Sequence, residues 1–448
     1  MAADTPTNIR NLVIYEIYVR NHGPHGTFSD VEADLPRIRA LGVDVLWFMP
    51  IHPIGQLHKK GSLGCPYSIQ DYRAVNPEYG SRDDFTRLVD RAQKLGLKVM
   101  IDVVYNHTAH DSVLVRDHPD WFHQDASGAL VTTVPDWSDV IDLKYWLGMP
   151  GGDLNEALAD YLIDTLKGWI ALGVDGFRCD VASLLPEAFW ARARREIAAV
   201  KPGVIWLAES VHAAFVGERR AVGLPTLSDG ELYRAFDLTY DYDVWPIWQA
   251  AVRGEAPVTC YLEMLRFQDC IYPANFVKLR CVENHDQPRI MALAPSRPQA
   301  LAWTAFQAFN RGAFLIYAGQ ESAATHTPSL FDIDKVAWGR YELQPFLATL
   351  ARLKKHAALV AGQFVVTAAE PAIQAGWTSA GEGLYGVFNV AAATGDVAVP
   401  LPDGEYGDLL NGRPVEVRGG RLALPEVATI LHHTAALRLR PLSSELLD

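Results

Sequence analysis

Three carboxylates, one arginine and two histidines stand where short apolar runs of the sequence end. They are His107, Arg178, Asp180, Glu209, His285 and Asp286. A carboxylate can attack a carbon centre, give or take a proton, or bind a metal ion, and a neighbouring charge influences which of these it does. If the apolar runs are strands that end at one face of a barrel, the six side chains converge on one site.

Two of these carboxylates have the surroundings that a nucleophile and an acid require. Arg178 and Asp180 are two residues apart, so they face the same side of a strand. We expect the Arg178 guanidinium to lower the pKa of Asp180, which suits a nucleophile that attacks a sugar. Glu209 follows the apolar run 204–208, and partial burial there is expected to raise its pKa, which suits a general acid. Two such carboxyl groups, about 5–5.5 Å apart, cleave a glycosidic bond with retention of configuration.

The apolar runs before these residues are predicted to be buried parallel strands, because they are short and continuous. Seven runs have this pattern: Val13–Tyr18, Val43–Met49, Lys98–Val104, Val174–Asp180, Val204–Glu209, Lys278–Glu283 and Ala313–Ala318. A weaker eighth run lies near Ala235–Thr239. Eight such strands would close a barrel.

Amphipathic helices are predicted between the strands. Ser81 and Asp84 form a capping box before a stretch whose apolar residues recur at helical spacing. A glycine follows three of the expected helices, at Gly42, Gly96 and Gly173, where it would take a left-handed cap before the next strand. Repeated strand–helix units of this kind predict an α/β fold, a (β/α)₈ barrel.

Two regions depart from this repeat. The segment 107–155 is irregular and too long for a simple connection, so it is predicted to be a small inserted domain after the third strand. After residue 360 the helical pattern ends, and alternating strands with turn pairs such as Asn411-Gly412 predict an all-β sandwich over 361–448. The barrel itself is then expected to comprise 1–106 and 156–360.

Composition narrows the classes of partner. The formal charge of −13 repels phosphate backbones and anionic lipid, so nucleic acid and membrane are not expected partners. No secretory signal or long apolar run is visible, and the five cysteines are odd in number and widely separated. These features favour a cytoplasmic protein with reduced thiols. Its oligomeric state does not follow from the sequence.

Four segments, in this order, resemble the signature motifs of the α-amylase family of glycoside hydrolases. They are DVVYNH at 102–107, GFRCD at 176–180, the glutamate at 209 and ENHD at 283–286. The stretch Gly64–Tyr72, continuing to Gly80, also resembles a conserved stretch of that family, and the similarity extends over about residues 12–325. The resemblance implies a barrel enzyme that acts on α-glucans or oligosaccharides through a retaining mechanism.

The resemblance also implies a role for each matching residue. Asp180 would be the nucleophile, Glu209 the acid/base and Asp286 the carboxylate that stabilises the transition state. Arg178 would hold Asp180, and Asp102 would support Arg178. His107 and His285 would bind hydroxyls of the sugar that is cleaved, and Tyr67 would stack beneath its ring.

No cofactor is required by this chemistry, but calcium is possible. Asn106 matches a calcium ligand of the family, and Asp153 or Asp142 could supply the partner carboxylate. The family often has a Lys-His pair after the nucleophile, and here the stretch 181–184 reads Val-Ala-Ser-Leu. The sequence therefore leaves a calcium site at Asn106 and Asp153 open.

Several functions are compatible with these residues. We expect hydrolysis of α-1,4-linked glucooligosaccharides or α-glucans, and the same residues could instead transfer a glucosyl or maltosyl unit to a sugar. The segment Pro50–Gly55, with Lys59 and Lys60, resembles maltosyl-transferring relatives. A Mg²⁺-dependent barrel enzyme is disfavoured because Arg178 would compete with the metal. A non-catalytic sugar-binding relative is disfavoured because both Asp180 and Glu209 are present.

Overall fold

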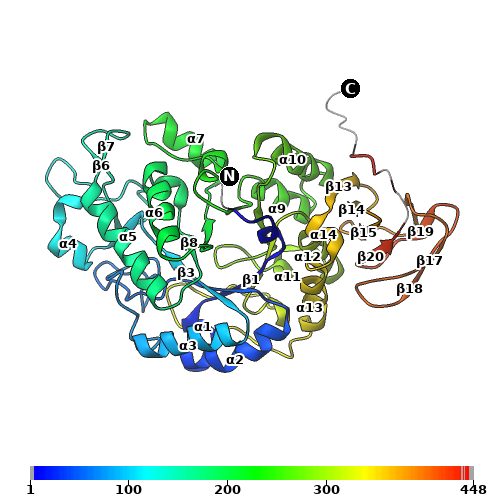
Figure 1. Ribbon diagram of the computed structural model, residues 1–448, viewed down its shortest axis with the longest axis horizontal. Helices are drawn as coiled ribbons and strands as arrows, with labels where there is room; N and C mark the ends of the chain where they lie inside the picture. Colours follow the sequence, from blue (N-terminus) through cyan, green and yellow to red (C-terminus); the bar gives the residue numbers. More distant parts are fainter. Residues whose placement is uncertain (1–4, 435–436, 438, 443–448) are drawn as a thin grey trace. The chain divides into compact units, whose positions relative to one another are not determined.

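The computed structural model describes residues 5–434, 437 and 439–442. This part of the chain forms two compact units. The first unit comprises 5–6, 14–243 and 328–337, and the second comprises 7–13, 244–327 and the described residues from 338 onward. Figure 1 shows both units, with many of their elements labelled.

Eight parallel strands form a closed barrel in the order β1, β12, β11, β10, β9, β8, β3 and β2. Their bounds are β1 Val13–Ile17, β2 Val45–Phe48, β3 Lys98–Val103, β8 Gly176–Cys179, β9 Ile205–Ala208, β10 Leu238–Tyr240, β11 Lys278–Arg280 and β12 Ala313–Tyr317. All their residues except Lys98 are buried, which is why most of their positions are apolar. The predicted barrel is confirmed, and the weak eighth run is β10.

Five helices of the first unit, α2, α3, α4, α5 and α8, begin at a side-chain cap. Both residues of the Ser81–Asp84 capping box are engaged, and Phe85, Leu88 and Val89 of the following helix are buried. The three glycines after helices α2, α3 and α5 have φ of 87°, 77° and 99°, so they adopt the left-handed backbone that was predicted. The helices are α1 Val19–His22, α2 Phe28–Ala40, α3 Arg82–Lys94, α4 Val113–Asp117, α5 Glu156–Ala171, α6 Glu187–Val200, α7 Ala213–Ala221 and α8 Asp229–Leu232. Short 3₁₀ turns lie at Pro119–Trp121 and Ala182–Leu184.

The segment that interrupts the repeat after β3 contains two short antiparallel sheets. β4 (His107–Ala109) pairs with β5 (Val140–Asp142), so that His107 lies opposite Asp142. β6 (Trp146–Leu147) pairs with β7 (Asp153–Leu154), and α5 begins two residues later. The predicted interruption is thus present, and its treatment as a separate domain over 107–155 remains a prediction.

A late segment of the chain, 328–337, belongs to the first unit and is bound to its beginning. The Tyr18 hydroxyl donates to the carbonyl of Leu330 over 3.0 Å, and the side-chain amide of Asn21 donates to Ser329 over 3.0 Å. Lys335 Nζ in turn donates to the carbonyl of Arg20 over 2.6 Å. Residues about three hundred positions apart are therefore joined by direct hydrogen bonds.

The second unit contains the remaining helices and an all-β region. The helices are α9 Trp245–Arg253, α10 Val258–Ile271, α11 Ile290–Leu293, α12 Arg297–Phe309, α13 Gln344–Leu353 and α14 Ala357–Ala361, with 3₁₀ turns at Thr7–Asn11 and Gln320–Ser322. The strands are β13 Gln363–Ala368, β14 Ile373–Ser379, β15 Glu382–Phe388, β16 Asp396–Ala398, β17 Gly404–Gly407, β18 Pro414–Val417, β19 Arg421–Ala423 and β20 Ala428–His433.

These strands form one four-stranded antiparallel sheet, β13-β14-β15-β20, and the pairs β16-β19 and β17-β18. Apolar residues of the sheet and the pairs, among them Tyr385, Val397 and Leu431, share one core. The predicted all-β region is confirmed. The strands β13, β14, β17 and β20 were not predicted individually. In β14, Ile373–Trp377 is buried at every position and shows no alternation.

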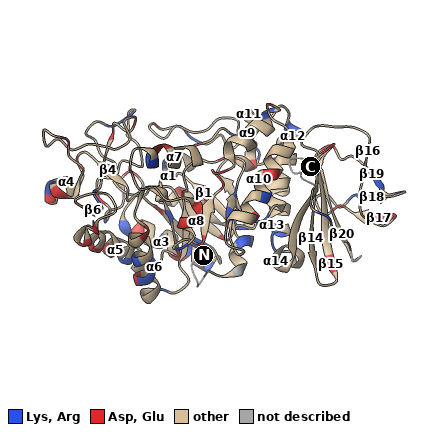
Figure 2. Cartoon of the chain, turned by 90° about the horizontal axis from the view of Figure 1, so that it is seen from above, with Lys and Arg blue, Asp and Glu red and all other residues tan. Residues whose placement is uncertain are grey.

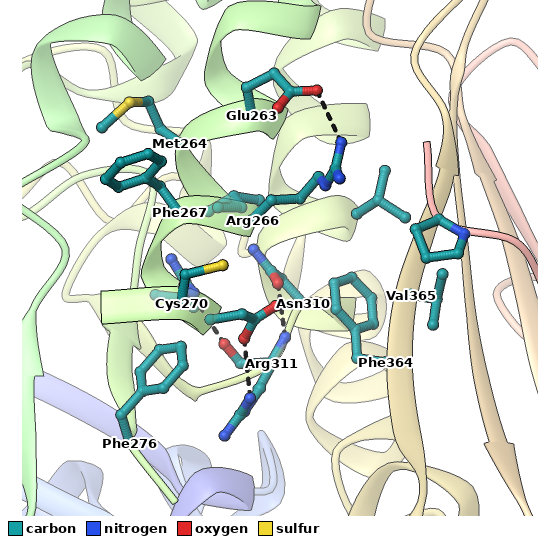
Figure 3. Close-up of a pocket in the computed structure, with 15 residues that line it drawn as sticks. Glu263, Met264, Arg266, Phe267, Cys270, Phe276, Asn310, Arg311, Phe364 and Val365 are labelled. Carbon is teal, nitrogen blue, oxygen red and sulfur yellow. Dashed lines mark hydrogen bonds and ion pairs between the residues drawn. The ribbon is translucent and has the colours of Figure 1, made fainter. Parts of the chain in front are cut away.

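A cavity of about 640 Å³ lies between α10 and β13 (Figure 3). Four of its charged residues form two ion pairs: Arg266 lies 3.1 Å from Glu263, and Arg311 lies 3.0 Å from Asp269. None of the site residues predicted from the sequence lines it. Among the described residues, no helix combines the length and apolar character that crossing a membrane requires.

Lys354 is fully buried in the second unit, at the end of α13. Its Nζ donates to the carbonyls of Asn310 and Gly312 over 3.1 and 2.6 Å. Burial, together with the charges of Lys355, Arg280 and Arg10, lowers the pKa of Lys354 to about 7. A lysine that is charged in the unfolded chain is thus largely neutral in the folded one above this pH.

We predict that Lys354 makes stability rise with pH between about 7 and 10. In this window the unfolded chain binds more protons than the folded chain, so the free energy of unfolding rises by up to about 1.4 kcal/mol per pH unit. The melting temperature of the wild type minus that of Lys354→Met should therefore increase from pH 7 to pH 9. The exposed Lys94→Met is the control, and equal pH profiles for wild type and Lys354→Met would contradict the prediction.

Candidate active site

The barrel places two carboxylates at the same level on neighbouring strands. β8 and β9 pair with Cys179 opposite Ala208, and Asp180 and Glu209 are the next residues of each strand. The ladder continues through them, because the N–H of Glu209 donates to the Cys179 carbonyl over 3.0 Å. Both side chains are more than nine-tenths buried. Backbone hydrogen bonds of the barrel, rather than a loop, therefore fix the backbone positions from which the two carboxyl side chains extend.

One buried guanidinium, that of Arg178, contacts three carboxylates. Its Nη1 lies 2.9 Å from Asp102 and 2.8 Å from Asp180, and its Nη2 lies 3.0 Å from Glu209. Burial acts to lower the pKa of Arg178, but the charges of Asp102 and Glu209 hold it well above its usual range. The carboxyl groups of Asp180 and Glu209 thus both contact the same guanidinium group, which limits the distance between them.

Aromatic residues enclose this guanidinium. Its Nε donates to the hydroxyl of Tyr240 over 3.2 Å, and its carbon lies 5.2 Å from the centre of the Trp47 ring. The Tyr67 hydroxyl donates to Asp102 over 3.0 Å, which fixes the ring of Tyr67 close to the ion cluster. Tyr240 and Trp47 were not singled out from the sequence, because a buried aromatic on a barrel strand looks like ordinary core.

The surroundings of Glu209 differ from the apolar setting expected from the sequence. Its Oε2 accepts the N–H of Val181 over 2.7 Å and also contacts Arg178. Both contacts favour the ionised carboxylate. The apolar run before Glu209 forms β9 itself, whereas the partners of the carboxyl group are Arg178 of β8 and Val181, two residues after that strand. The protonation that an acid requires remains a proposal.

Val181 has an unusual backbone conformation. Its φ of 35° and ψ of 45° lie in the left-handed region, which a β-branched residue rarely adopts. This conformation directs the chain into the 3₁₀ turn after β8 while the N–H of Val181 binds Glu209. The sequence carries no signal for it, because a valine normally indicates an extended or helical backbone.

His107 lies beside Asp180 and belongs to the inserted segment. Its Nε2 is 3.9 Å from Asp180 Oδ2, and the Trp137 ring is 5.3 Å from the imidazole. Burial lowers the pKa of His107, although the nearby charges of Asp142 and Glu209 oppose this. His107 thus joins Asp102, Arg178, Asp180, Glu209 and Tyr67 in the first unit. Trp137 was missed because its segment has no regular pattern.

His285 and Asp286 belong to the second unit, in the segment after β11. His285 Nε2 lies 3.1 Å from Asp286 Oδ2, and the N–H of Asp286 donates to the Asn284 side chain over 2.9 Å. His285 is buried, whereas the Asp286 side chain is 39% exposed. These contacts define the orientation of Asp286 within its own unit. Its position opposite Asp180 and Glu209 stays a prediction.

Glu283 and Arg289 support this segment. Glu283 lies 2.7 Å from Arg289, and it accepts the N–H of Ile290 over 2.8 Å. Burial raises the pKa of Glu283, and the Arg289 charge opposes the shift. Arg289 was not singled out from the sequence, because it lies six residues beyond Glu283, outside the motif.

The calcium site at Asn106 and Asp153 stays a prediction. Calcium takes roughly six to eight oxygen ligands. Asn106 is buried, with its Nδ2 3.2 Å from the Nδ1 of His107, whereas Asp153 is exposed on β7. Asp142, the alternative partner, accepts the N–H of Thr133 over 2.7 Å. No step of the chemistry proposed below depends on calcium.

Comparisons with known proteins agree with this architecture. Residues 7–148 match the family model "Alpha amylase, catalytic domain", and 364–431 match "Bacterial Alpha amylase C-terminal domain". The structure is similar to that of an α-amylase from Lactobacillus plantarum, with 44% identity, a TM-score of 0.91 and coverage of 96% of this chain and all of the other. A maltogenic α-amylase from Thermotoga neapolitana is 31% identical, with a TM-score of 0.83 and coverage of 96% and 100%.

Curated relatives include longer proteins. An α-1,4-glucan:maltose-1-phosphate maltosyltransferase from Pseudomonas aeruginosa is 28% identical over 375 residues, which is 76% of this chain and 52% of that protein. One of that name from Cereibacter sphaeroides is 36% identical over 204 residues, 42% of this chain and 33% of that protein. The chain thus spans about half or less of the length of these relatives.

The barrel and its relatives place the protein among enzymes that act on glycosidic bonds. The chain belongs to the α-amylase family.

We predict that Arg178→Lys lowers kcat/KM on an α-glucan by about 10²–10³-fold. The lysine ammonium group is a point charge and lacks the planar, multidentate donors of a guanidinium, so it cannot hold three carboxylates. Loss of one preorganised electrostatic contact typically lowers the rate by this factor. Steady-state kinetics measure the effect, and circular dichroism checks that the fold persists.

Arg192→Lys is a matched control for this change. Arg192 contacts three carboxylates on the outer helices α5 and α6, namely Glu156, Asp160 and Glu196, and Figure 2 shows the mixed charges of these helices. Surface pairs contribute little, so activity should not change. Equal losses in both variants would show that the Arg178 cluster has no special role in turnover.

Proposed function

We propose that the protein is a retaining glycoside hydrolase that cleaves α-1,4-linked glucooligosaccharides or α-glucans. The observation that carries this proposal is the contact of one buried guanidinium with both Asp180 and Glu209. A shared guanidinium holds two carboxyl groups close enough to act on one anomeric carbon. The 44% identical α-amylase, which this chain covers in full, supports hydrolysis and an α-glucan substrate.

In the proposed reaction, Asp180 attacks the anomeric carbon while Glu209 gives its proton to the departing sugar oxygen. The glycosidic bond breaks and an ester bond to Asp180 forms. Water then attacks the same carbon, Glu209 takes its proton, and Asp180 leaves as a carboxylate. Glu209 must be protonated for the first step, so desolvation by the bound sugar has to offset the two contacts that favour its ionised form.

The remaining residues are proposed to bind and orient the sugar. His107 lies near Asp180 and would donate to a hydroxyl of the glucose unit that is cleaved, as would His285. Tyr67 would pack against the same ring, and its hydroxyl bond to Asp102 fixes its plane. Asp286, which is the most exposed of the three carboxylates, would bind hydroxyls and stabilise the positive charge of the transition state.

Transfer to a sugar is the second candidate function. It is favoured by the curated relatives, whose names describe maltosyl transfer. The ester on Asp180 can be attacked by water or by a sugar hydroxyl, and both use Glu209 as the base. The two functions therefore share every residue named above and differ in what reaches the ester.

We predict that Asp180→Asn lowers kcat by at least about 10³-fold, the scale for loss of a covalent nucleophile. The measurement is release of reducing ends from maltooligosaccharides. Asp164→Asn, which removes an exposed carboxylate paired with Arg73, is the control and should be fully active. Near-normal turnover by Asp180→Asn would reject the assignment.

The role of Glu209 can be tested separately, with α-maltosyl fluoride as the substrate. Fluoride leaves without a proton, so Glu209→Gln should still form the ester but lose the base that hydrolyses it. Mass spectrometry should then find a maltosyl group on the peptide that contains Asp180. If Glu209→Gln neither accumulates this ester nor slows turnover of natural substrates, Glu209 is not the acid/base.

Product analysis separates hydrolysis from transfer. We predict that incubation with a single maltooligosaccharide gives only shorter sugars, because the 44% identical relative is an amylase. The products are separated by chromatography at early times. Longer sugars that appear before the substrate is consumed would instead establish transfer.

A further inference from the structure

A group of two histidines and one glutamate lies in the second unit, outside the site described above. Ligand atoms of His356, Glu382 and His432 all lie within 4.8 Å of one another. Among the described residues, no other group of three or more His, Cys, Asp or Glu side chains converges to such a spacing. None of the three residues has a place in the proposed glycosidase chemistry.

Regular elements hold the three residues in position. β15 and β20 are antiparallel, with Leu384 opposite His432, so Glu382 is the diagonal neighbour of His432 on the same face of the sheet. His432 Nε2 lies 3.1 Å from Glu382 Oε2. His356 precedes α14, which lies beside β14 and β15 in Figure 1, and its ring centre is 5.7 Å from that of His432. Three separate elements therefore contribute one donor each.

We propose that these three side chains form a binding site for a divalent transition-metal ion of the zinc type. Two imidazoles and one carboxylate are a common ligand set for zinc, with bonds of about 2.0–2.2 Å. Ligand atoms at the corners of a tetrahedron of that size are about 3.4 Å apart. The 3.1 Å between His432 and Glu382 is close to this spacing, and His356 completes it by a small movement of its ring.

An ordinary ion pair explains only part of this arrangement. A His–carboxylate contact accounts for His432 and Glu382, as it does for His25 and Asp30 at 2.9 Å in the first unit. It does not account for the second imidazole beside them. The side chains of His432 and Glu382 are 38% and 32% exposed, so an ion can reach them and a water molecule can complete its coordination.

Metal binding would change one existing contact. His356 Nδ1 now accepts the N–H of Ala358 over 3.2 Å at the start of α14. An ion on Nε2 needs the ring proton on Nδ1, so this hydrogen bond breaks, whereas an ion on Nδ1 replaces the N–H directly. In either case the ion ties the start of α14 to β15 and β20, and its expected role is structural.

The test is zinc binding by the untagged full chain after removal of metal with a chelator. We expect about one Zn²⁺ per chain to remain after dialysis against micromolar Zn²⁺, and calorimetry to show a saturable site. Calcium should not compete, because it prefers oxygen ligands. His356→Asn, which retains a capping oxygen for α14, and His432→Asn should each weaken binding at least about 10-fold.

His25→Ala is the matched control, because it removes an exposed histidine from a His–carboxylate pair that lacks a third ligand. It should bind zinc as the wild type does. Zinc should also raise the melting temperature of wild type and His25→Ala, but not that of the His356→Asn/His432→Asn double variant. Absence of stoichiometric zinc in the wild type, or equal binding by the double variant, would overturn the proposal. Glycosidase activity is not the readout, so the outcome does not depend on the proposed function.

Discussion

The buried ion cluster around Arg178 is the interaction on which the candidate active-site carboxylates of the first unit depend. One guanidinium contacts Asp102, Asp180 and Glu209, and these residues come from or directly follow three adjacent barrel strands, β3, β8 and β9. Leaving a buried charge without its partner costs about 3–5 kcal/mol. The strands must therefore keep their register for the cluster to form, and the cluster in turn fixes the carboxyl groups against Arg178.

The sequence was sufficient to predict the barrel and the residues of this cluster. Apolar runs identified seven barrel strands and a weaker run indicated the eighth, because parallel strands are buried on both faces and show no polar alternation. The spacing of Arg178 and Asp180 then predicted that they share a side of β8, and they lie 2.8 Å apart. Local pattern was enough here, because strand ends of a parallel barrel meet at one face whatever the loops do.

The sequence was not sufficient where the environment comes from elsewhere in the chain. The hydrogen bond from Val181 to Glu209 depends on a left-handed valine, which no propensity favours. The ring of Trp137 reaches His107 from an irregular segment, and the partners of Glu209 come from β8 rather than from its own apolar run. Residues Ile373–Trp377 of β14 are all buried, so they likewise lack the alternation that marks an antiparallel strand.

The hydrogen bonds between 328–337 and the beginning of the chain have a consequence for biosynthesis. Tyr18, Arg20 and Asn21 reach their partners only after about three hundred further residues have been added. Contacts between such distant positions form slowly, because a long loop must close before they contribute. A nascent chain that has not yet reached residue 337 therefore lacks these hydrogen bonds of its first unit. We expect a chaperone to protect the nascent chain from aggregation mainly during this interval.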